Sequence, residues 1–136
     1  MPILVEKHST IPDLLVMKVL DPWNATELSN SIVEANQRIL EHQSDNAMSV
    51  IVDGSDSTGF PLDINLMPIL TSAFMNFRGH YGIFTVRNAI GMSAMEMLVR
   101  RMGKRARNFA FVGSLDEAYQ KLEQMKDRDT RHDDYF

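Results

Sequence analysis

Short apolar segments that alternate with longer amphipathic segments constrain the fold of this chain more than any other feature. The apolar segments are rich in β-branched or aromatic residues, and Asp-Pro and Asp-Gly follow the first two of them. Such segments are typical of buried β-strands. We predict strands at residues 14–20 (LLVMKVL), 48–52 (MSVIV), 81–86 (YGIFTV) and 109–112 (FAFV), and an additional edge strand at residues 3–7.

The segments between these strands have the periodicity of amphipathic helices, because apolar residues recur every three or four positions. Asn24 or Thr26 can cap the first helix, and Gly103 ends the third. Ser114 and Glu117 have the spacing of a capping box at the start of the fourth. We predict four helices: residues 26–42, a helix that starts near Asp63 or Asn65 and contains Phe77, residues 89–102, and a helix that follows Ser114.

The resulting order, strand then helix repeated four times, predicts an α/β fold with a mixed, mostly parallel sheet of four to five strands and about four helices. A chain of 136 residues, 44% of them apolar, has enough apolar surface for one core. We expect one domain over residues 1–125. Residues 126–136 (KDRDTRHDDYF) are too charged for a core, and we expect a tail there.

Composition excludes several classes of function. The net charge of −4 provides no long-range attraction for nucleic acid or an anionic membrane. Without cysteine there is no disulfide, thiolate nucleophile or cysteine metal site, and the four histidines lie singly along the chain. The N-terminal ILV run is too short for a signal peptide or a membrane span. We expect a cytoplasmic protein without bound metal, nucleic-acid partner or stable membrane insertion.

The stretch IVDGSDSTGF, residues 51–60, has the oxygen-rich composition of a cation loop or a phosphate loop. An EF-hand loop counted from Asp53 would place Thr58 where glycine is needed and Ile64 where glutamate is needed. A P-loop would need lysine after Gly59, but Phe60 stands there. The stretch is therefore predicted to be a turn between a strand and a helix.

Two further patterns permit more than one interpretation. Residues 99–107 (VRRMGKRAR) contain five cations, which either form a solvated helix end or bind an anion or a partner. Met92, Met95, Met97 and Met102 either fill the core or line an adaptable apolar pocket or partner face.

The segment YGIFTVRNAIGMSAMEMLVRRMGKRARNFAFVGSLDEAYQKLEQM, together with SVIVDGSDSTGFP, resembles the small SpoIIAA-like proteins of the STAS superfamily. The resemblance spans approximately residues 12–126 and is strongest in GSLDEAYQKL. It implies a mixed sheet with helices packed on it. In anti-sigma-factor antagonists of this family, a partner kinase phosphorylates a serine at the start of the second helix and so breaks a protein–protein interface.

The family motif begins several residues after the Asp that ends the strand, which here is Asp53. Its acceptor position therefore falls on Leu62, next to Asp63, and leucine cannot be phosphorylated. We expect Ser57, in the DSTG sequence, to belong to the turn before the switch position.

Arg87, Asn88 and Ser93 lie where the predicted strand 81–86 ends and the third helix begins. Open α/β sheets place ligands at such strand ends, and the first amides of a helix favour a negative charge. We predict that these residues bind a partner protein or a small anionic ligand, with Arg87 as a bidentate donor. The structural alternative is that Asn88 caps the helix and Arg87 pairs with a nearby carboxylate.

Leu62, Asp63, Met92 and Met95 complete the predicted binding site. The resemblance favours a non-enzymatic STAS-like regulatory or binding domain, with a homodimer left open. No nucleophile motif such as Gly-x-Ser-x-Gly occurs, so we expect neither enzymatic activity nor a cofactor.

Two other functions compete with this one. The first is a carrier of a small apolar or lipid-like molecule, which would need a pocket lined by Met92, Met95 and Phe74. The second, less favoured, is an enzyme that holds an anionic substrate near Arg87.

Overall fold

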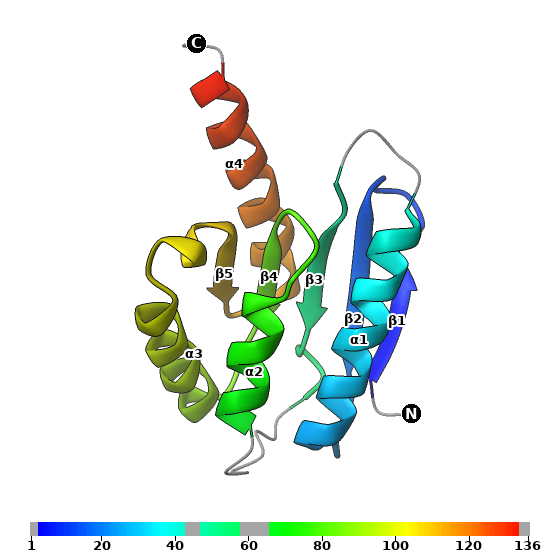
Figure 1. Ribbon diagram of the computed structural model, residues 1–136, viewed down its shortest axis with the longest axis vertical. Helices are drawn as coiled ribbons and strands as arrows, with labels where there is room; N and C mark the ends of the chain where they lie inside the picture. The colour runs from blue at the N-terminus through cyan, green and yellow to red at the C-terminus, as the bar shows by residue number, and fades with distance from the viewer. Residues whose placement is uncertain (1–2, 43–46, 58–65, 134–136) are drawn as a thin grey trace.

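A five-stranded mixed sheet forms the centre of the protein (Figure 1). The computed structural model describes residues 3–42, 47–57 and 66–133. The strands follow one another across the sheet in chain order; β1 is antiparallel to β2, and the other neighbours are parallel. Their bounds are β1 Ile3–Lys7, β2 Leu14–Val19, β3 Ser49–Asp53, β4 Gly82–Thr85 and β5 Phe109–Val112. The predicted α/β class, the mostly parallel sheet and the extra edge strand are confirmed.

The described residues contain four α-helices and one short 3₁₀ helix. Their bounds are α1 Ala25–Glu41, α2 Leu66–Met75, α3 Ala89–Met102, η1 Gly103–Asn108 and α4 Leu115–Asp133. The predicted start of the second helix near Asp63 or Asn65 lies outside the described residues. The prediction did not include η1, which occupies most of the basic stretch.

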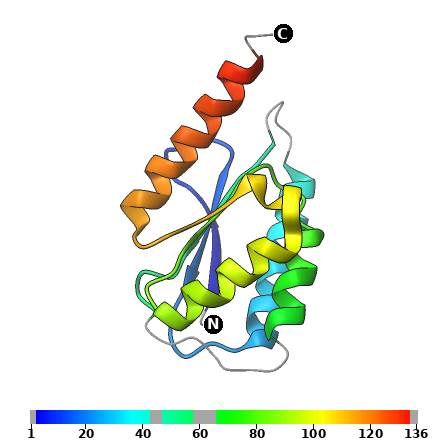
Figure 2. The same ribbon diagram turned by 90° about the vertical axis from the view of Figure 1, so that its left-hand side faces the viewer.

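The helices are divided unequally between the two faces of the sheet (Figure 2). Parallel crossovers are right-handed, so strands added in one direction place every crossover helix on the same face. The helices α1, α2 and α3 accordingly cover one face, while α4, which follows the last strand, covers the other.

Alternation along the strands divides the apolar core into two layers. One row across the sheet pairs Val16 with Ile51, Ile51 with Ile83, and Ile83 with Ala110, and these side chains pack under α4. The neighbouring residue Val50 points to the other face, where the larger core contains residues of α1, α2 and α3. The period of two in strands explains this division.

Local capping sets the start of α1, the end of α3 and the start of α4 as the sequence predicts, whereas α2 ends at Met75, before the expected Phe77. Asn24 caps α1, its side chain accepting from the Glu27 amide at 2.8 Å. Gly103, with φ of +60°, ends α3 in a left-handed conformation that favours glycine. The Ser114 hydroxyl accepts from the Glu117 amide at 3.2 Å, and the Glu117 carboxylate accepts from the amide of Gly113, one residue before the expected partner.

The charged segment that we expected to form a tail from residue 126 instead continues α4 to Asp133. Charged residues are unsuited to a core, but they are compatible with a solvated helix. A cluster of polar contacts around Asp129 holds this part of α4 to the domain, so the boundary at residue 125 falls inside a helix.

Candidate functional site

A pocket of about 70 Å³ lies between the sheet and the helices α1, α2 and α3, at the carboxyl ends of β2, β3 and β4. Its lining combines apolar residues, among them Val52, Leu70, Phe84 and Met95, with polar residues, among them Trp23, Ser57, Arg87 and Asn88. This is the end of the sheet at which open α/β folds place ligands. Arg87, Asn88 and Met95 of the predicted site are brought together here.

Trp23 and Ser57 join the segment after β2 to the turn after β3. The Trp23 indole Nε1 donates to the Ser57 hydroxyl at 3.1 Å, and that hydroxyl donates to Asp21 Oδ1 at 2.7 Å. The Ser57 amide donates to the Gly54 carbonyl, which closes the predicted turn. Ser57 is buried, so its hydroxyl serves to hold this turn in place.

The same turn is tied to β4 through Gly54. The Gly54 amide donates to the Thr85 hydroxyl, which in turn donates to the Val52 carbonyl at 3.3 Å. A Cβ on Gly54 would lie 2.7 Å from the Thr85 carbonyl oxygen, closer than a side chain allows. Glycine is needed here because the backbones of the turn and β4 approach closely.

Arg87 lies exposed at the rim of the pocket. Its guanidinium Nη1 donates to the Ser55 carbonyl at 2.8 Å, which holds the side chain beside the turn after β3. The sequence-based alternative, in which Arg87 pairs with a surface carboxylate, does not match this contact with a backbone oxygen.

Asn88 is the N-cap of α3, as the structural alternative predicted. Its side-chain oxygen accepts from the amides of Ile90 at 2.8 Å and Gly91 at 3.3 Å. An anion at this helix start would have to displace that oxygen. The cap therefore weakens the prediction that the amides of α3 themselves bind a small anion.

The other predicted site residues lie elsewhere. Ser93 is exposed on α3, more than one turn beyond the cap, and is not among the residues that line the pocket. Met92 is half-buried and does not line it either. Leu62 and Asp63 lie outside the described residues.

A second, smaller cavity of about 40 Å³ adjoins the first beneath α1 and α2. Aromatic side chains surround it: the ring centroid of Phe74 lies 4.9 Å from that of Phe84 and 4.6 Å from that of Phe109. A water molecule takes about 30 Å³ of liquid, and sites for small molecules usually measure about 300–1,000 Å³. Neither cavity has room for a lipid-like molecule.

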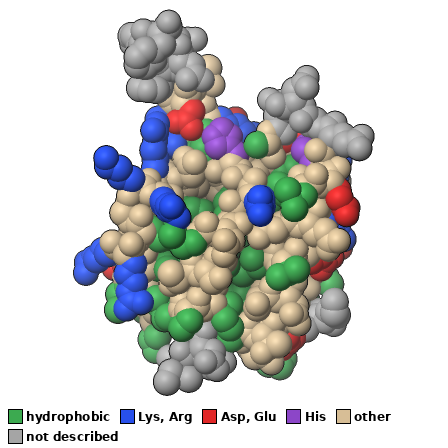
Figure 3. Space-filling model, viewed as in Figure 1, with side chains coloured by type: hydrophobic (Ala, Val, Ile, Leu, Met, Phe, Trp, Pro, Cys, Tyr) green, Lys and Arg blue, Asp and Glu red, His purple; other side chains and the backbone are tan. Residues whose placement is uncertain are grey.

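The basic stretch at the end of α3 and in η1 lies on the surface, along the left edge in Figure 3. Arg105 Nη1 donates to Met75 Sδ at 3.3 Å, so η1 contacts α2. Arg100, Arg101 and Lys104 make no ion pair with any described residue. All three side chains are exposed along this edge.

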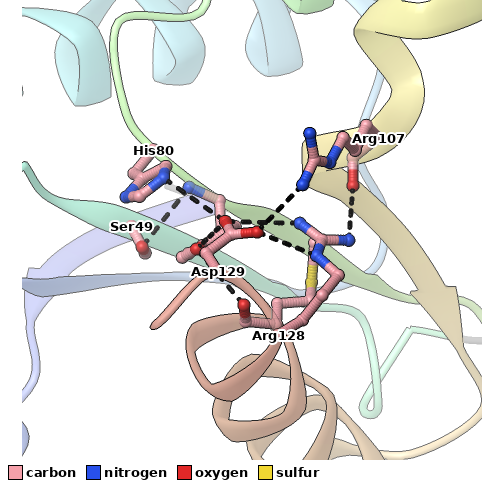
Figure 4. A network of polar contacts seen from close by, with 7 residues as sticks. Ser49, His80, Arg107, Arg128 and Asp129 are labelled. Carbon is pink, nitrogen blue, oxygen red and sulfur yellow. Dashed lines mark hydrogen bonds and ion pairs between the residues drawn. The ribbon is translucent and has the colours of Figure 1, made fainter. Parts of the chain in front are cut away.

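A polar network lies at the opposite end of β4 (Figure 4). The Tyr81 hydroxyl donates to Asp129 and to the Met125 carbonyl, and Asp129 Oδ1 accepts from Arg128 at 2.9 Å and from Arg107 at 3.2 Å. Hydrogen bonding from Arg128 and then from Tyr81 lowers the pKa of Asp129 to about 2. Burial, followed by the bond to Asp129, raises the pKa of Tyr81 to about 12. The network joins α4 to the sheet and to η1.

His42 pairs with Asp13, with Nε2 2.6 Å from Oδ1. The sequence did not predict this contact. His42 borders an open groove of about 340 Å³ at the amino ends of β2 and β3, together with Lys7, Arg38 and Glu41. His42 and Asp13 are 29 positions apart, beyond the reach of spacing arguments. Among the described residues no group of three or more His, Asp or Glu side chains could hold a metal ion.

Comparisons of this chain with family models, with curated proteins and with solved structures found no match. Within the part of the chain that the structure describes, no helix has the length and apolar character needed to cross a membrane.

Proposed function

We propose that this protein is a non-enzymatic STAS-like binding domain that engages a partner protein through the carboxyl edge of its sheet. The observation that carries the proposal is the pocket beside Arg87, which has an apolar floor, a polar rim and a volume of about 70 Å³. That volume suits one side chain of a larger partner better than a free ligand, since sites for free ligands usually measure about 300–1,000 Å³.

The chemistry of the rim favours a carboxylate on the partner. The Asn88 side-chain oxygen already accepts hydrogen bonds from the first amides of α3. The exposed Arg87 guanidinium is therefore the group best placed to attract a negative charge. A guanidinium can pair with a carboxylate through two parallel hydrogen bonds. The net charge of −4 makes nucleic acid a poor partner, and the absence of cysteine fits a location in the reducing cytoplasm.

Binding is better supported than catalysis because the polar side chains of the rim are engaged in hydrogen bonds within the protein. Ser57 is hydrogen-bonded to Trp23 and Asp21, while Arg87 is hydrogen-bonded to the Ser55 carbonyl.

The carrier function has weaker support. Met95 and Phe74 line two separate small cavities, and Met92 lines neither.

The test begins with capture of partners from a cell extract on immobilised protein, followed by titration of the purified partner. Trp23 is the only tryptophan in the chain and lines the pocket, so its fluorescence reports binding there. Arg87→Ala should weaken binding by about 1.5–3 kcal/mol, the contribution of a hydrogen bond to a charged group. Arg78→Ala, an exposed arginine at the opposite end of β4, is the matched control and should bind like wild type.

Equal affinity of Arg87→Ala and wild type would remove Arg87 from the site and overturn the proposal. A small molecule retained by the natively purified protein in native mass spectrometry, with no protein partner captured, would establish the carrier function instead.

A further inference from the structure

The helix α2 has no charged residue from Leu66 to Met75, although it lies in the middle of the exposed helix layer (Figure 1). Pro68, Ser72 and Met75 on this helix are exposed. The centres of protein interfaces are depleted in charge and enriched in methionine. The surface of α2 thus has the composition of an interface centre.

Exposed apolar side chains accompany α2 on both sides. On α1, Val33 is 63% and Leu40 is 66% exposed; on α3, Ile90 is 57% and Met97 is 51% exposed. Each pair is seven residues apart, about two helical turns, so its two members lie on one side of their helix. Single exposed apolar residues are ordinary, but two pairs at this spacing form apolar stripes on either side of the uncharged helix.

The two flanking helices carry opposite charge. Three glutamates and one arginine lie in α1, whereas α3 and η1 together carry one glutamate and five cations. In Figure 3 the Lys and Arg side chains gather over α3 and η1 at the left edge, and Asp and Glu side chains appear at the right edge. The layer is therefore acidic on the side of α1 and basic on the side of α3, with the uncharged helix α2 between them.

We propose that two copies of this chain associate through the layer of α1, α2 and α3, about a two-fold axis that runs along α2. Such an axis sets α1 of each copy against α3 of the other, so the acidic helix meets the basic helix twice and the apolar stripes meet each other. An interface of this kind uses the same patch on both subunits and closes as a dimer.

The size of the layer is close to that of the face a stable dimer buries. The helices α1, α2 and α3, of 17, 10 and 14 residues, are about 25, 15 and 21 Å long at a rise of 1.5 Å per residue. At a spacing of about 8–10 Å between helices, the face measures about 500–600 Å² in projection. This area approaches the ~800 Å² of accessible surface that each partner buries in a standard interface. A groove of about 310 Å³ between α1 and α2, bordered by Val33 and Ile69, can receive side chains of the second copy.

The test is the mass in solution, measured by sedimentation and by light scattering after size exclusion. Wild type should have twice the chain mass of 15.5 kDa, and rising salt should weaken the dimer. Glu41→Lys and Arg100→Glu reverse one charge on each side of the layer. Neither residue makes an ion pair among the described residues, so both variants should keep their fold. Each should raise the dissociation constant of its homodimer at least about tenfold, because like charges then face each other twice.

Mixing the two variants should restore a dimer, because both contacts in the mixed pair are again between opposite charges. Leu40→Ser gives an independent test. It should weaken the dimer and have only a small effect on the stability of the monomer, since Leu40 is 66% exposed. Lys121→Glu, exposed on α4 across the sheet, is the matched control and should dimerise like wild type.

A wild-type protein that stays monomeric at its highest soluble concentration would overturn the proposal. A dimer that both charge reversals leave unchanged would also overturn it, because the copies would then meet through another surface.

Discussion

Tyr81→Phe removes one hydroxyl from the network that holds α4 to β4, while the buried ring stays in place. The hydroxyl donates to the Asp129 carboxylate and to the Met125 carbonyl. A hydrogen bond to a charged group contributes about 1.5–3 kcal/mol. The side chain of Asp129 is 25% exposed and keeps its contacts with Arg107 and Arg128, so water and the two guanidinium groups compensate for part of the loss. We expect a decrease of about 1–2 kcal/mol in the free energy of unfolding at neutral pH.

The effect of this substitution should depend on pH in a definite direction. The pKa of Asp129 is lowered from 3.8 to about 2 in the folded protein, so its ionised form stabilises the fold above the unfolded pKa, and this contribution is lost as the pH falls through the folded pKa. Tyr81→Phe removes one cause of that shift. The difference between wild type and Tyr81→Phe should therefore be full above about pH 4 and should shrink toward about pH 2.

Urea denaturation followed by circular dichroism measures both effects. Tyr119→Phe is the matched control, because Tyr119 is a half-buried tyrosine of α4 without a contact to Asp129; it should change stability by less than about 0.5 kcal/mol. A double-mutant cycle with Asp129→Asn isolates the coupling between the two side chains. If Tyr81→Phe costs no more than Tyr119→Phe, or costs the same when Asp129 is already Asn, the assigned role of the hydroxyl is wrong.

Three further substitutions test the candidate site. Gly54→Ala should destabilise by about 1–3 kcal/mol in urea, because the new Cβ would lie 2.7 Å from the Thr85 carbonyl; an unchanged midpoint would contradict the close approach. Ser57→Ala should cost about 1–2 kcal/mol and shift the Trp23 emission, since it removes the acceptor of the indole N–H, and an unaltered spectrum would speak against this contact. Asn88→Ala should cost about 1 kcal/mol and speed hydrogen exchange at the first amides of α3, whereas wild-type exchange rates would show that the cap is not needed.

Much of the secondary structure was predictable because its signals lie within a few residues of one another. The helix α3 ends where Gly103 can take a left-handed conformation and begins after Asn88, whose side chain reaches amides two and three residues ahead. The edge strand β1 and the strand β5 have the predicted bounds. The end of α4 was not predictable in this way, because the contacts that anchor its charged second half come from Tyr81 and Arg107, far away in the chain.

The candidate site was predictable only in part, for the same reason. Arg87 and Asn88 were found because they follow a recognisable strand, and strand ends are where ligands bind. Trp23 and Ser57 were missed because their contact spans 34 residues and depends on how β2 and β3 pair. Ser93, which the sequence grouped with Arg87, lies more than one turn beyond the cap of α3 and does not line the pocket, because nearness in sequence alone does not bring two side chains to one pocket.

Local signals in the sequence were enough to predict the class of fold, the positions of the strands and the ends of α1 and α3, because periodicity and capping act over one or two turns. Three other features depend on packing between distant segments: α1, α2 and α3 share one face, α4 holds Tyr81 through Asp129, and Trp23 meets Ser57 beside Arg87. These arrangements depend on strand order and register, and each joins residues tens of positions apart. Local sequence patterns do not specify contacts between residues so far apart, because these contacts form only when the helices pack on the completed sheet.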